Sequence, residues 1–307
     1  MLAGGVGAAK FLRGLLRRVD ARRIRVIVNT GDDEEFYGLH VSPDVDTIVY
    51  TLAGVANPLH GWGLRGESFR LLGALERFYG RAWFALGDRD LATHLYRTER
   101  LRAGRTLSQV TGEIAARFGV KAAVIPMSDD RVRTFVKLRG RPDALAFQEY
   151  LVHRRARGAV ERIELRGVEQ AAPAPAALRA IETSAAVVLA PSNPFVSLGP
   201  ILALGGIREA LRAVKRRVAA LSPIVGGRTI KGPADRMMRG LGHDVSPLGV
   251  ARLYQDCVGV FVLDNADRRY LPAIEALGMR AVATDTIMAT PARAARLADV
   301  VMRALAV

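Results

Sequence analysis

The sequence predicts an α/β protein: a three-layer α/β/α, Rossmann-like core with a mostly parallel sheet, interrupted by an inserted mixed-β subdomain. Short apolar runs alternate with amphipathic segments along most of the 307 residues. This alternation is typical of parallel strands that helices cover on both faces. It stops between residues 132 and 167, where three β-rich runs follow one another without a helical segment, as in an antiparallel excursion.

The same alternation gives each element a residue range. The expected core strands are residues 24–30, 122–127, 185–190, 217–225, 259–265 and 280–286. The expected helices are residues 8–18, 68–79, 90–101, 106–118, 207–215, 246–257 and 290–305. We interpret the chain as one continuous unit, in which the core is made by residues 1–125 and 176–307 and the β-rich insertion by residues 126–175.

The stretch GGVGAAK is typical of a loop that holds phosphate at the start of a helix. Gly4, Gly5 and Gly7 allow positive φ and a close approach of backbone N–H groups to an anion. A helix from about Ala8 would point its positive end at that anion, and Lys10 would add a charge. A tight strand–helix turn without a ligand is an equally good interpretation.

Such a turn normally follows a strand, yet only three residues precede the glycines. We expect residues 1–3 to be the remaining part of that strand, and the gene to begin a few codons farther upstream. Ligands of open α/β sheets bind at the carboxyl ends of the strands. The turn therefore lies where a ligand would bind.

The composition limits the possible classes of function. The single cysteine, Cys257, rules out an intrachain disulfide and argues against a cysteine-built metal site. No apolar run approaches the roughly 20 residues that span a bilayer, so we expect a cytoplasmic protein without a membrane partner. The net charge of +15 is spread along the chain. Phosphorylated substrates explain this charge as well as a nucleic acid would, and we expect no nucleic-acid partner.

An acidic segment, NTGDDEEFYGLHVSPDVDTIVYTLAG, follows the strand expected beside the first one. Asn29 and Thr30 form a turn at the carboxyl end of that strand and are candidate ligand-binding residues. Asp44 is a plausible N-cap of the next helix, and Asp46 lies in its first turn, where the helix dipole favours a carboxylate. Two carboxylates beside a phosphate loop are also ligands that Mg²⁺ accepts. The spacing leaves both interpretations open.

The stretch ALGDRDLATHLYRT again places polar residues after a strand. Asp88 is a candidate cap for the following helix, and Arg89 and Arg97 are candidates for a phosphate clamp. Pairs on a solvated helix face are the alternative. We favour, by about two to one, a structural role for His94 as a partly buried side chain with its hydrogen bonds satisfied over a role as a catalytic base.

Two further polar loops follow strands, APSNPFVSLGPI and SPIVGGRTIKGPADRMM. Each has the composition of an ordinary turn, but the edge of a parallel sheet would bring both to the same cleft as the loops above. The candidate ligand-binding residues are Ser192, Asn193 and Ser197 in the first loop and Gly226, Gly227 and Lys231 in the second.

The ordered series of these motifs, from residue 2 to about residue 288, resembles the CofD-like family of 2-phospho-L-lactate transferases. The matching stretches are LAGGVGAAKFLRGL, NTGDD, GLHVSPDVDTIVYTLAG, W-x-ALGDRDLATH, IPMSDD, APSNPFVSLGPIL, SPIVGG, KGPADRMM and ATDTIM. Each motif alone is weak, whereas the series in this order is specific.

The resemblance implies a Mg²⁺-dependent transferase of coenzyme F-420 biosynthesis. In that family a guanosine diphosphate ester of a three-carbon acid gives its phospho-acid to the ribityl hydroxyl of the deazaflavin FO, and GMP leaves. The acid is lactate or enolpyruvate, and the sequence does not distinguish them. We also expect a homodimer.

The resemblance further suggests roles for individual residues. Asp46 and Arg89 are expected to be catalytic, and Asp44 and Asp46 to bind Mg²⁺ or to orient the attacking hydroxyl. Trp62 is expected either to stack on the deazaflavin ring or to be an ordinary core or lid residue. The remaining candidates for holding donor or acceptor are Gly4, Gly5, Gly7, Lys10, Asn29, Thr30, Ser192, Asn193, Ser197, Gly226, Gly227 and Lys231.

Three other functions share individual features with this sequence. A non-catalytic regulator of the gluconeogenesis-factor type, which binds a nucleotide sugar, resembles the N-terminal part of the chain. An NAD-dependent dehydrogenase would need an acid at the end of the second strand, where Asn29 and Thr30 stand instead. A nucleic-acid-binding module would show a steep dependence of affinity on salt.

Overall fold

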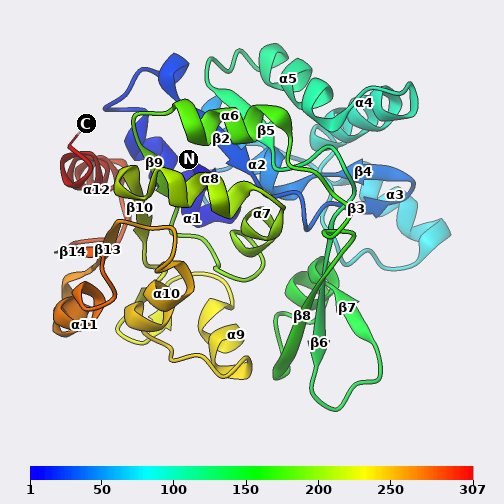
Figure 1. Cartoon of the computed structure of the whole chain (residues 1–307). Coiled ribbons are helices and arrows are strands. Elements are labelled where there is room, and N and C mark those ends of the chain that lie inside the picture. Colours follow the sequence, from blue (N-terminus) through cyan, green and yellow to red (C-terminus); the bar gives the residue numbers. More distant parts are fainter. Residues whose placement is uncertain (307) are drawn as a thin grey trace.

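A computed structural model describes residues 1–306. Its centre is a seven-stranded sheet of order β14-β13-β10-β9-β1-β2-β5, in which every neighbouring pair is parallel (Figure 1). The predicted α/β class and parallel sheet are confirmed. The strands are β1 (Leu2–Ala3), β2 (Arg25–Val28), β5 (Ala123–Pro126), β9 (Val187–Leu189), β10 (Val218–Leu221), β13 (Val260–Asp264) and β14 (Arg280–Thr284).

Helices cover both faces of this sheet. Successive side chains of a strand point to opposite faces, so Leu2 joins one apolar core and Ala3 the other. The core around Ala3 is closed by α1 (Gly5–Leu15), α2 (Pro43–Leu52), α5 (Leu107–Arg117) and α12 (Pro291–Ala304). The core around Leu2 is closed by α6 (Pro175–Thr183), α7 (Gly199–Ala203), α8 (Ile207–Ala213), α10 (Pro247–Tyr254) and α11 (Leu271–Glu275).

The other elements lie around this body. The remaining helices are α3 (Arg70–Tyr79), α4 (Asp90–Arg102) and α9 (Ala234–Gly240), with 3-10 turns at Ala21–Arg23, Lys215–Arg217 and Asn265–Tyr270. Two short hairpins pair β3 (Glu34–Phe36) with β4 (Leu39–Val41) and β11 (Ile224–Val225) with β12 (Arg228–Thr229). Among residues 1–306, the helices are all too short or too polar to cross a membrane.

The first strand is only two residues long, yet it lies inside the sheet. Leu2 pairs with Ile27 of β2 on one side and with Leu189 of β9 on the other. The strand expected within residues 1–3 is thus present. Because β1 is an interior strand, the glycine turn leaves the sheet between β9 and β2.

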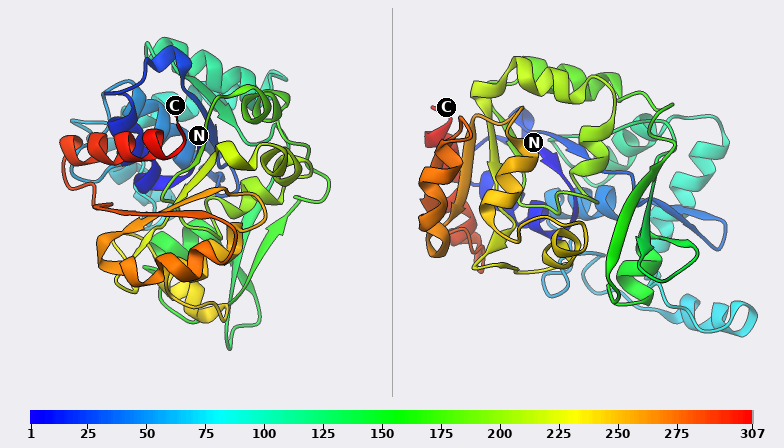
Figure 2. Two further views of the ribbon diagram at one scale, coloured as in Figure 1. Left: turned by 60° about the vertical axis from the view of Figure 1, so that its left-hand side comes forward. Right: turned by 60° about the horizontal axis from the view of Figure 1, so that its bottom comes forward.

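The insertion is an antiparallel sheet of order β7-β6-β8, and no parallel pair makes it mixed (Figure 2). Its strands are β6 (Arg133–Leu138), β7 (Ala144–Ala146) and β8 (Val160–Arg166). The second β-rich run continues as a π-helix, Glu149–His153, which brings Tyr150 into a small core with Val136 and Leu145. This core packs on Val196 and Met237 of the main body, so the insertion is attached to it by apolar contacts.

Two helix starts differ from the predictions. Helix α1 begins at Gly5 and not near Ala8. The N-cap of α2 is Ser42, not Asp44. Proline is favoured at the first position of a helix because its fixed φ suits the helix and its missing N–H is not needed there. Pro43 therefore sets the start of α2 and leaves Asp44 inside the first turn, with its carboxylate free for tertiary contacts.

Asp88 does not cap the helix that follows it. Its carboxylate accepts hydrogen bonds from the backbone N–H groups of Arg70 and Leu71, both at 3.0 Å. It therefore caps α3, a helix that lies before it in the chain, and the N-cap of α4 is Arg89. The local sequence could not distinguish these two helix ends.

Candidate active site

A single large cleft, with a volume of about 820 Å³, lies at the carboxyl ends of the central strands. Its walls come from the start of α1, the first turn of α2, the loop after β9, the segment between β11 and α9, and the insertion. Loops far apart in the sequence therefore meet, as the parallel sheet requires. The predicted residues that line the cleft are Gly4, Gly5, Gly7, Lys10, Asp44, Asp46, Trp62, Ser192, Asn193, Ser197 and Lys231.

The glycines of the first turn allow close packing. A Cβ atom on Gly7 would lie 2.3 Å from the carbonyl oxygen of Pro191, and one on Gly4 would lie 2.7 Å from the Cβ of Ser197. Gly5 has a φ of +69°, a region that favours glycine. Its N–H donates to Asp44 Oδ1 at 2.7 Å. The positive end of α1 thus already faces the carboxylate of Asp44. This contact holds the first turn of α2 against the glycine turn.

Asn29 joins two buried acids. Its Nδ2 donates to Asp32 Oδ1 at 2.7 Å and to Asp44 Oδ2 at 3.0 Å, with the carbonyl of Val196 at 3.2 Å. Gln148, from the insertion, donates to the other oxygen of Asp32 at 3.0 Å. Asn29 lies behind the cleft wall, whereas Asp32 and Asp44 line the cleft. The amide positions both carboxylates.

These two acids carry charge that no basic side chain balances. Within residues 1–306, neither Asp32 nor Asp44 is in a salt bridge. Burial raises the pKa of Asp44 to about 6. Burial, followed by the charges of Asp44 and Asp33, raises the pKa of Asp32 well above its usual range. A cation in the cleft would relieve this repulsion, and carboxylate oxygens are the ligands of Mg²⁺.

Asp46 has a different partner from Asp44. Its carboxylate is bound by both terminal nitrogens of Arg97, one of them at 3.1 Å, and Arg97 is completely buried. The expected phosphate clamp at Arg97 is therefore ruled out, because its guanidinium has no exposed face. Asp44 and Asp46 share the first turn of α2 and both line the cleft, but they belong to different hydrogen-bonded clusters.

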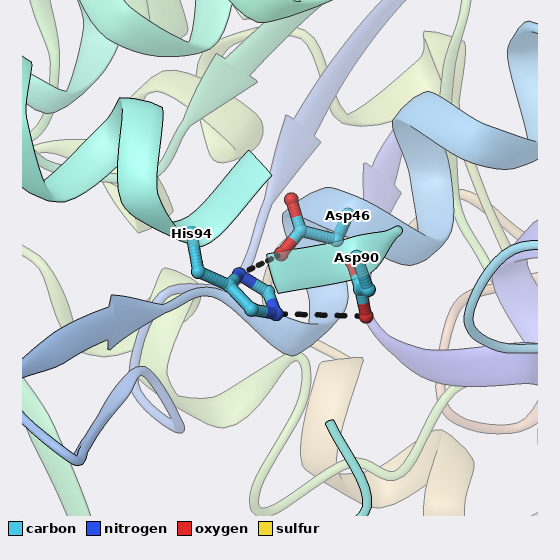
Figure 3. Close-up of side chains that lie close together, drawn as sticks. All are labelled: Asp46, Asp90 and His94. Atoms are coloured by element: carbon cyan, nitrogen blue, oxygen red, sulfur yellow. Dashed lines mark ion pairs between the residues drawn. The ribbon is translucent and has the colours of Figure 1, made fainter. Parts of the chain in front are cut away.

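A buried histidine lies between Asp46 and Asp90 (Figure 3). His94 Nδ1 is 3.7 Å from Asp46, and its Nε2 is 3.5 Å from Asp90 Oδ2. The other oxygen of Asp90 accepts a hydrogen bond from the hydroxyl of Tyr50 at 2.5 Å. His94 Nε2 has no hydrogen-bond partner within residues 1–306. The histidine is thus buried as expected, but only partly satisfied, and it lines the cleft.

Two sets of side chains could therefore hold a metal ion. Asp46, Asp90 and His94 bring three ligand atoms within 4.8 Å of one another, but the guanidinium of Arg97 already balances one of their charges. Asp32 and Asp44 have two carboxylates and no cation. A carboxylate that is already paired with a guanidinium attracts a further cation less strongly than an unpaired carboxylate does. The charge balance therefore favours the second set.

Other predicted residues lie outside the cleft wall. Arg89 is exposed, and its guanidinium donates to the carbonyl of Arg65 at 2.8 Å. Gly226 and Gly227 form the turn between β11 and β12. Thr30 is buried behind the wall, as Asn29 is. None of these four residues lines the cleft. A position near a cleft-lining residue in the sequence is therefore not enough to bring a side chain into the cleft.

The family model described as "2-phospho-L-lactate transferase CofD" matches residues 1–302. The chain belongs to the CofD family. A phosphoenolpyruvate transferase from Streptomyces griseus is 44% identical over 94% of this chain and 92% of its own length. A 2-phospho-L-lactate transferase from Methanosarcina mazei is 36% identical over 99% of both chains. These full-length similarities favour the transferase over the non-catalytic regulator.

The CofD-family chain also shares its fold with a more distant protein. A crystal structure of a UPF0052 family member from Bacillus halodurans matches with a TM-score of 0.67 over 98% of this chain, at 15% sequence identity. At this identity the match supports the fold alone. The Rossmann-like, largely parallel architecture is thus common to both proteins.

Some cleft residues of this CofD-family chain were not predicted. Asp32 belongs to the acidic run after β2, and its place in the loop that leaves this strand was a usable signal. Gln148, Trp83 and Phe84 also line the cleft. Trp83 opens the matching stretch W-x-ALGDRDLATH without having been assigned to the cleft, and Gln148 stands in no recognisable motif. Only the folding of the insertion against the β3–β4 side brings these residues together. These cleft residues are identified by their position in the folded chain and not by their spacing in the sequence.

Proposed function

We propose that this chain transfers the phosphorylated three-carbon acid of a guanosine diphosphate ester to the ribityl hydroxyl of FO and releases GMP. We further propose that the acid is enolpyruvate. Three relatives named phosphoenolpyruvate transferase are 42–44% identical to this chain, whereas a 2-phospho-L-lactate transferase from Methanosarcina mazei is 36% identical. The observation that carries the proposal is one cleft of about 820 Å³ that joins the glycine turn, Asp44 and Lys231.

The reaction needs positioning and charge neutralisation more than a covalent nucleophile. The hydroxyl oxygen forms a bond to the phosphorus that carries the acid. The bond from that phosphorus to the bridging oxygen breaks, GMP leaves with the electron pair of that bond, and water takes up the hydroxyl proton. A single cleft that holds donor and acceptor together supplies most of what this step requires.

Two lysines are well placed to hold the diphosphate. Lys10 and Lys231 line the cleft from α1 and from the segment before α9. Burial and then the charge of Lys10 lower the pKa of Lys231. Its Nζ donates to the carbonyl of His60 at 2.7 Å. Because two positive groups lie close together, a phosphate between them would stabilise both.

Asp44, with Asp32, would hold Mg²⁺, and the ion would supply positive charge to offset that of the phosphate groups. Asp46 would orient the attacking hydroxyl, because Arg97 fixes its carboxylate at the cleft wall. Asn193 would contact the guanosine. Among residues 1–306, the only hydrogen-bond partner of its Nδ2 is the thioether of Met237, at 3.2 Å, and such sulfur is a weak acceptor.

The test is to incubate the purified chain with FO, Mg²⁺ and either the lactyl or the enolpyruvyl donor. Chromatography measures the release of GMP, and mass spectrometry determines the mass of the product formed from FO. We expect product with the enolpyruvyl donor at a higher kcat/KM. Absence of GMP release with both donors would refute the transferase, and a preference for the lactyl donor would refute the choice of acid. Cytoplasmic location and a homodimer stay predictions.

A further inference from the structure

Arg133 joins the insertion to residues 31–34, which we call the acidic loop (Figure 1). This arginine is the first residue of β6. Its Nη1 donates to the backbone carbonyl oxygen of Asp33 at 2.8 Å, and its Nη2 binds the carboxylate of Glu34. The planar guanidinium holds both acceptors in one fixed geometry. A single side chain of the insertion therefore fixes both the backbone of the loop and its last carboxylate.

The backbone of the insertion contacts the same loop. The N–H of Thr134 donates to the carbonyl oxygen of Gly31 at 2.5 Å. A Cβ on Gly31 would lie 2.8 Å from Thr134 Oγ1 and 3.0 Å from Asn29 Oδ1. Position 31 therefore needs glycine, because any larger side chain would have to push the loop away from β6.

The insertion also reaches the loop carboxylate that lines the cleft. Gln148 Nε2 donates to Asp32 Oδ2 at 3.0 Å, and both side chains are buried. Asn29 donates to the other oxygen of Asp32. The carboxylate can therefore turn only by breaking one of these bonds. Each of the four successive residues of the acidic loop has a hydrogen-bonding partner in the insertion.

Neither Arg133 nor Gln148 supplies a counter-charge to Asp32. The guanidinium of Arg133 is paired with Glu34, and the amide of Gln148 is neutral. The insertion thus fixes the position of Asp32 without neutralising it. Such a carboxylate suits a divalent cation, because Mg²⁺ demands oxygen ligands in near-ideal geometry. Hydrogen bonds to a metal-binding carboxylate are what hold it in that geometry.

We propose that Arg133 and Gln148 are positioning residues for Asp32, so that the insertion sets the affinity of the cleft for its divalent cation. This inference rests on the proposed function, in which Asp44 and Asp32 hold Mg²⁺. Arg133 is not among the residues that line the cleft, so it acts only through the acidic loop.

Binding of Mn²⁺ to the full-length chain, without substrates, tests the proposal. Mn²⁺ takes the same oxygen ligands as Mg²⁺, and the electron paramagnetic resonance signal of free Mn²⁺ gives its Kd. The variants are Arg133→Met and Gln148→Met. Removing a hydrogen-bonding partner of a metal ligand weakens metal binding by about 10- to 100-fold. We therefore expect each variant to bind Mn²⁺ at least about tenfold more weakly than the wild type.

The matched control is Arg154→Met. Arg154 is an arginine of the same insertion, and its ion-pair partner is Glu149, which also belongs to the insertion. Its loss should leave the Kd of Mn²⁺ within about twofold. Arg133→Lys, which keeps the charge, should recover part of the lost affinity. Urea denaturation reports the stability of each variant, and a purely structural Arg133 would change that stability but not the Kd of the folded protein.

Charge alone predicts the opposite result for Arg133→Met. The variant removes a positive charge near the loop, which would tighten Mn²⁺ binding, so tighter or unchanged binding overturns the proposal. Gln148→Met alters no charge, and it decides the question if Arg133→Met does not fold. The proposal also fails if the wild type binds no Mn²⁺, or if Asp32→Asn binds it as tightly as the wild type.

The proposed function can fail separately. A wild type that binds Mn²⁺ but makes no product from FO would refute the transfer reaction. Weaker Mn²⁺ binding by Arg133→Met and Gln148→Met would in that case still support the positioning role of the insertion.

Discussion

Asp44 accepts a hydrogen bond from the backbone N–H of Gly5 at 2.7 Å, so the acid of α2 lies at the positive end of α1. The turn that resembles a phosphate loop thus has an anion of its own. In the proposed reaction a phosphate would enter beside this carboxylate, and a cation between the two would make that arrangement favourable. The predictions below follow from this relationship and from the clusters around it.

Asp44→Asn removes the charge but keeps an oxygen for the Gly5 N–H. We expect transfer to fall about 10²- to 10³-fold, as for other single electrostatic groups of active sites. Folding should be retained, because the variant no longer buries an unbalanced charge. GMP release and thermal unfolding measure the two effects. The control is Asp143→Asn, an exposed acid of the insertion, and near-normal transfer by Asp44→Asn would disprove the assignment.

Mg²⁺ binding distinguishes the two acidic clusters. In the absence of substrate, Mg²⁺ at 100 times its Kd should stabilise the wild type by about 2.7 kcal/mol. We expect this gain to disappear in Asp32→Asn and to persist in Asp46→Asn. Unfolding by urea with and without Mg²⁺ gives the answer. The reverse pattern would move the metal to Asp46, Asp90 and His94.

Arg97→Met should be strongly destabilising. It leaves Asp46 buried without its partner, and breaking a buried ion pair in this way costs about 3–5 kcal/mol. Urea denaturation measures the loss. The double variant with Asp46→Leu should recover much of it, because both charges are then gone. Additive losses in the double variant would contradict the pairing.

Gly7→Ala tests the tight turn. Its Cβ would overlap the carbonyl of Pro191, so we expect a loss of about 1–3 kcal/mol from the required shift. The matched control is Gly73→Ala in α3, where a Cβ meets nothing within 4 Å and helix propensity predicts a gain of about 0.5–1 kcal/mol. Equal stabilities of the two variants would count against the packing role.

Glu113 links α4 to α5, and its contribution should depend on pH. Hydrogen bonds from Tyr96 and then Arg100 lower its pKa to about 2. A lowered acid pKa stabilises the fold above the ordinary pKa of glutamate, and this contribution is lost as the pH falls toward 2. Glu113→Gln should therefore lower Tm at pH 7 and lose its effect near pH 2–3. Glu169→Gln, at an exposed site, should be neutral at both pH values.

The sequence predicted the sheet and the loops that border the cleft, because apolar strands and glycine-rich turns leave local patterns. It could not predict which way the side chains at these loops face. Asp44 and Asp46 are two residues apart, yet one contacts Asn29 and the other Arg97. Such partners lie in distant elements and follow only from the packing of α2 against α1 and α4.

The aromatic end of the cleft, at Trp83 and Phe84, was missed for a related reason. Trp83 and Val152 are 69 positions apart and belong to no shared motif, whereas Trp62 stands in a conspicuous apolar stretch. Burial does not separate the two tryptophans, because Trp62 is 43% exposed and Trp83 is 37% exposed. Only the fold shows that the ring of Trp83 packs against Phe36 and Phe84.

The interior position of β1 has a consequence for synthesis. An elongating chain can pair β1 with β2 as soon as residue 28 is available, but Leu189, its other neighbour, is made only after the whole insertion. Until then the nascent chain exposes an unpaired strand edge, and Gly7 lacks the Pro191 carbonyl on which it packs. Ribosome-bound intermediates of this length should therefore be good chaperone clients, since open edges favour aggregation.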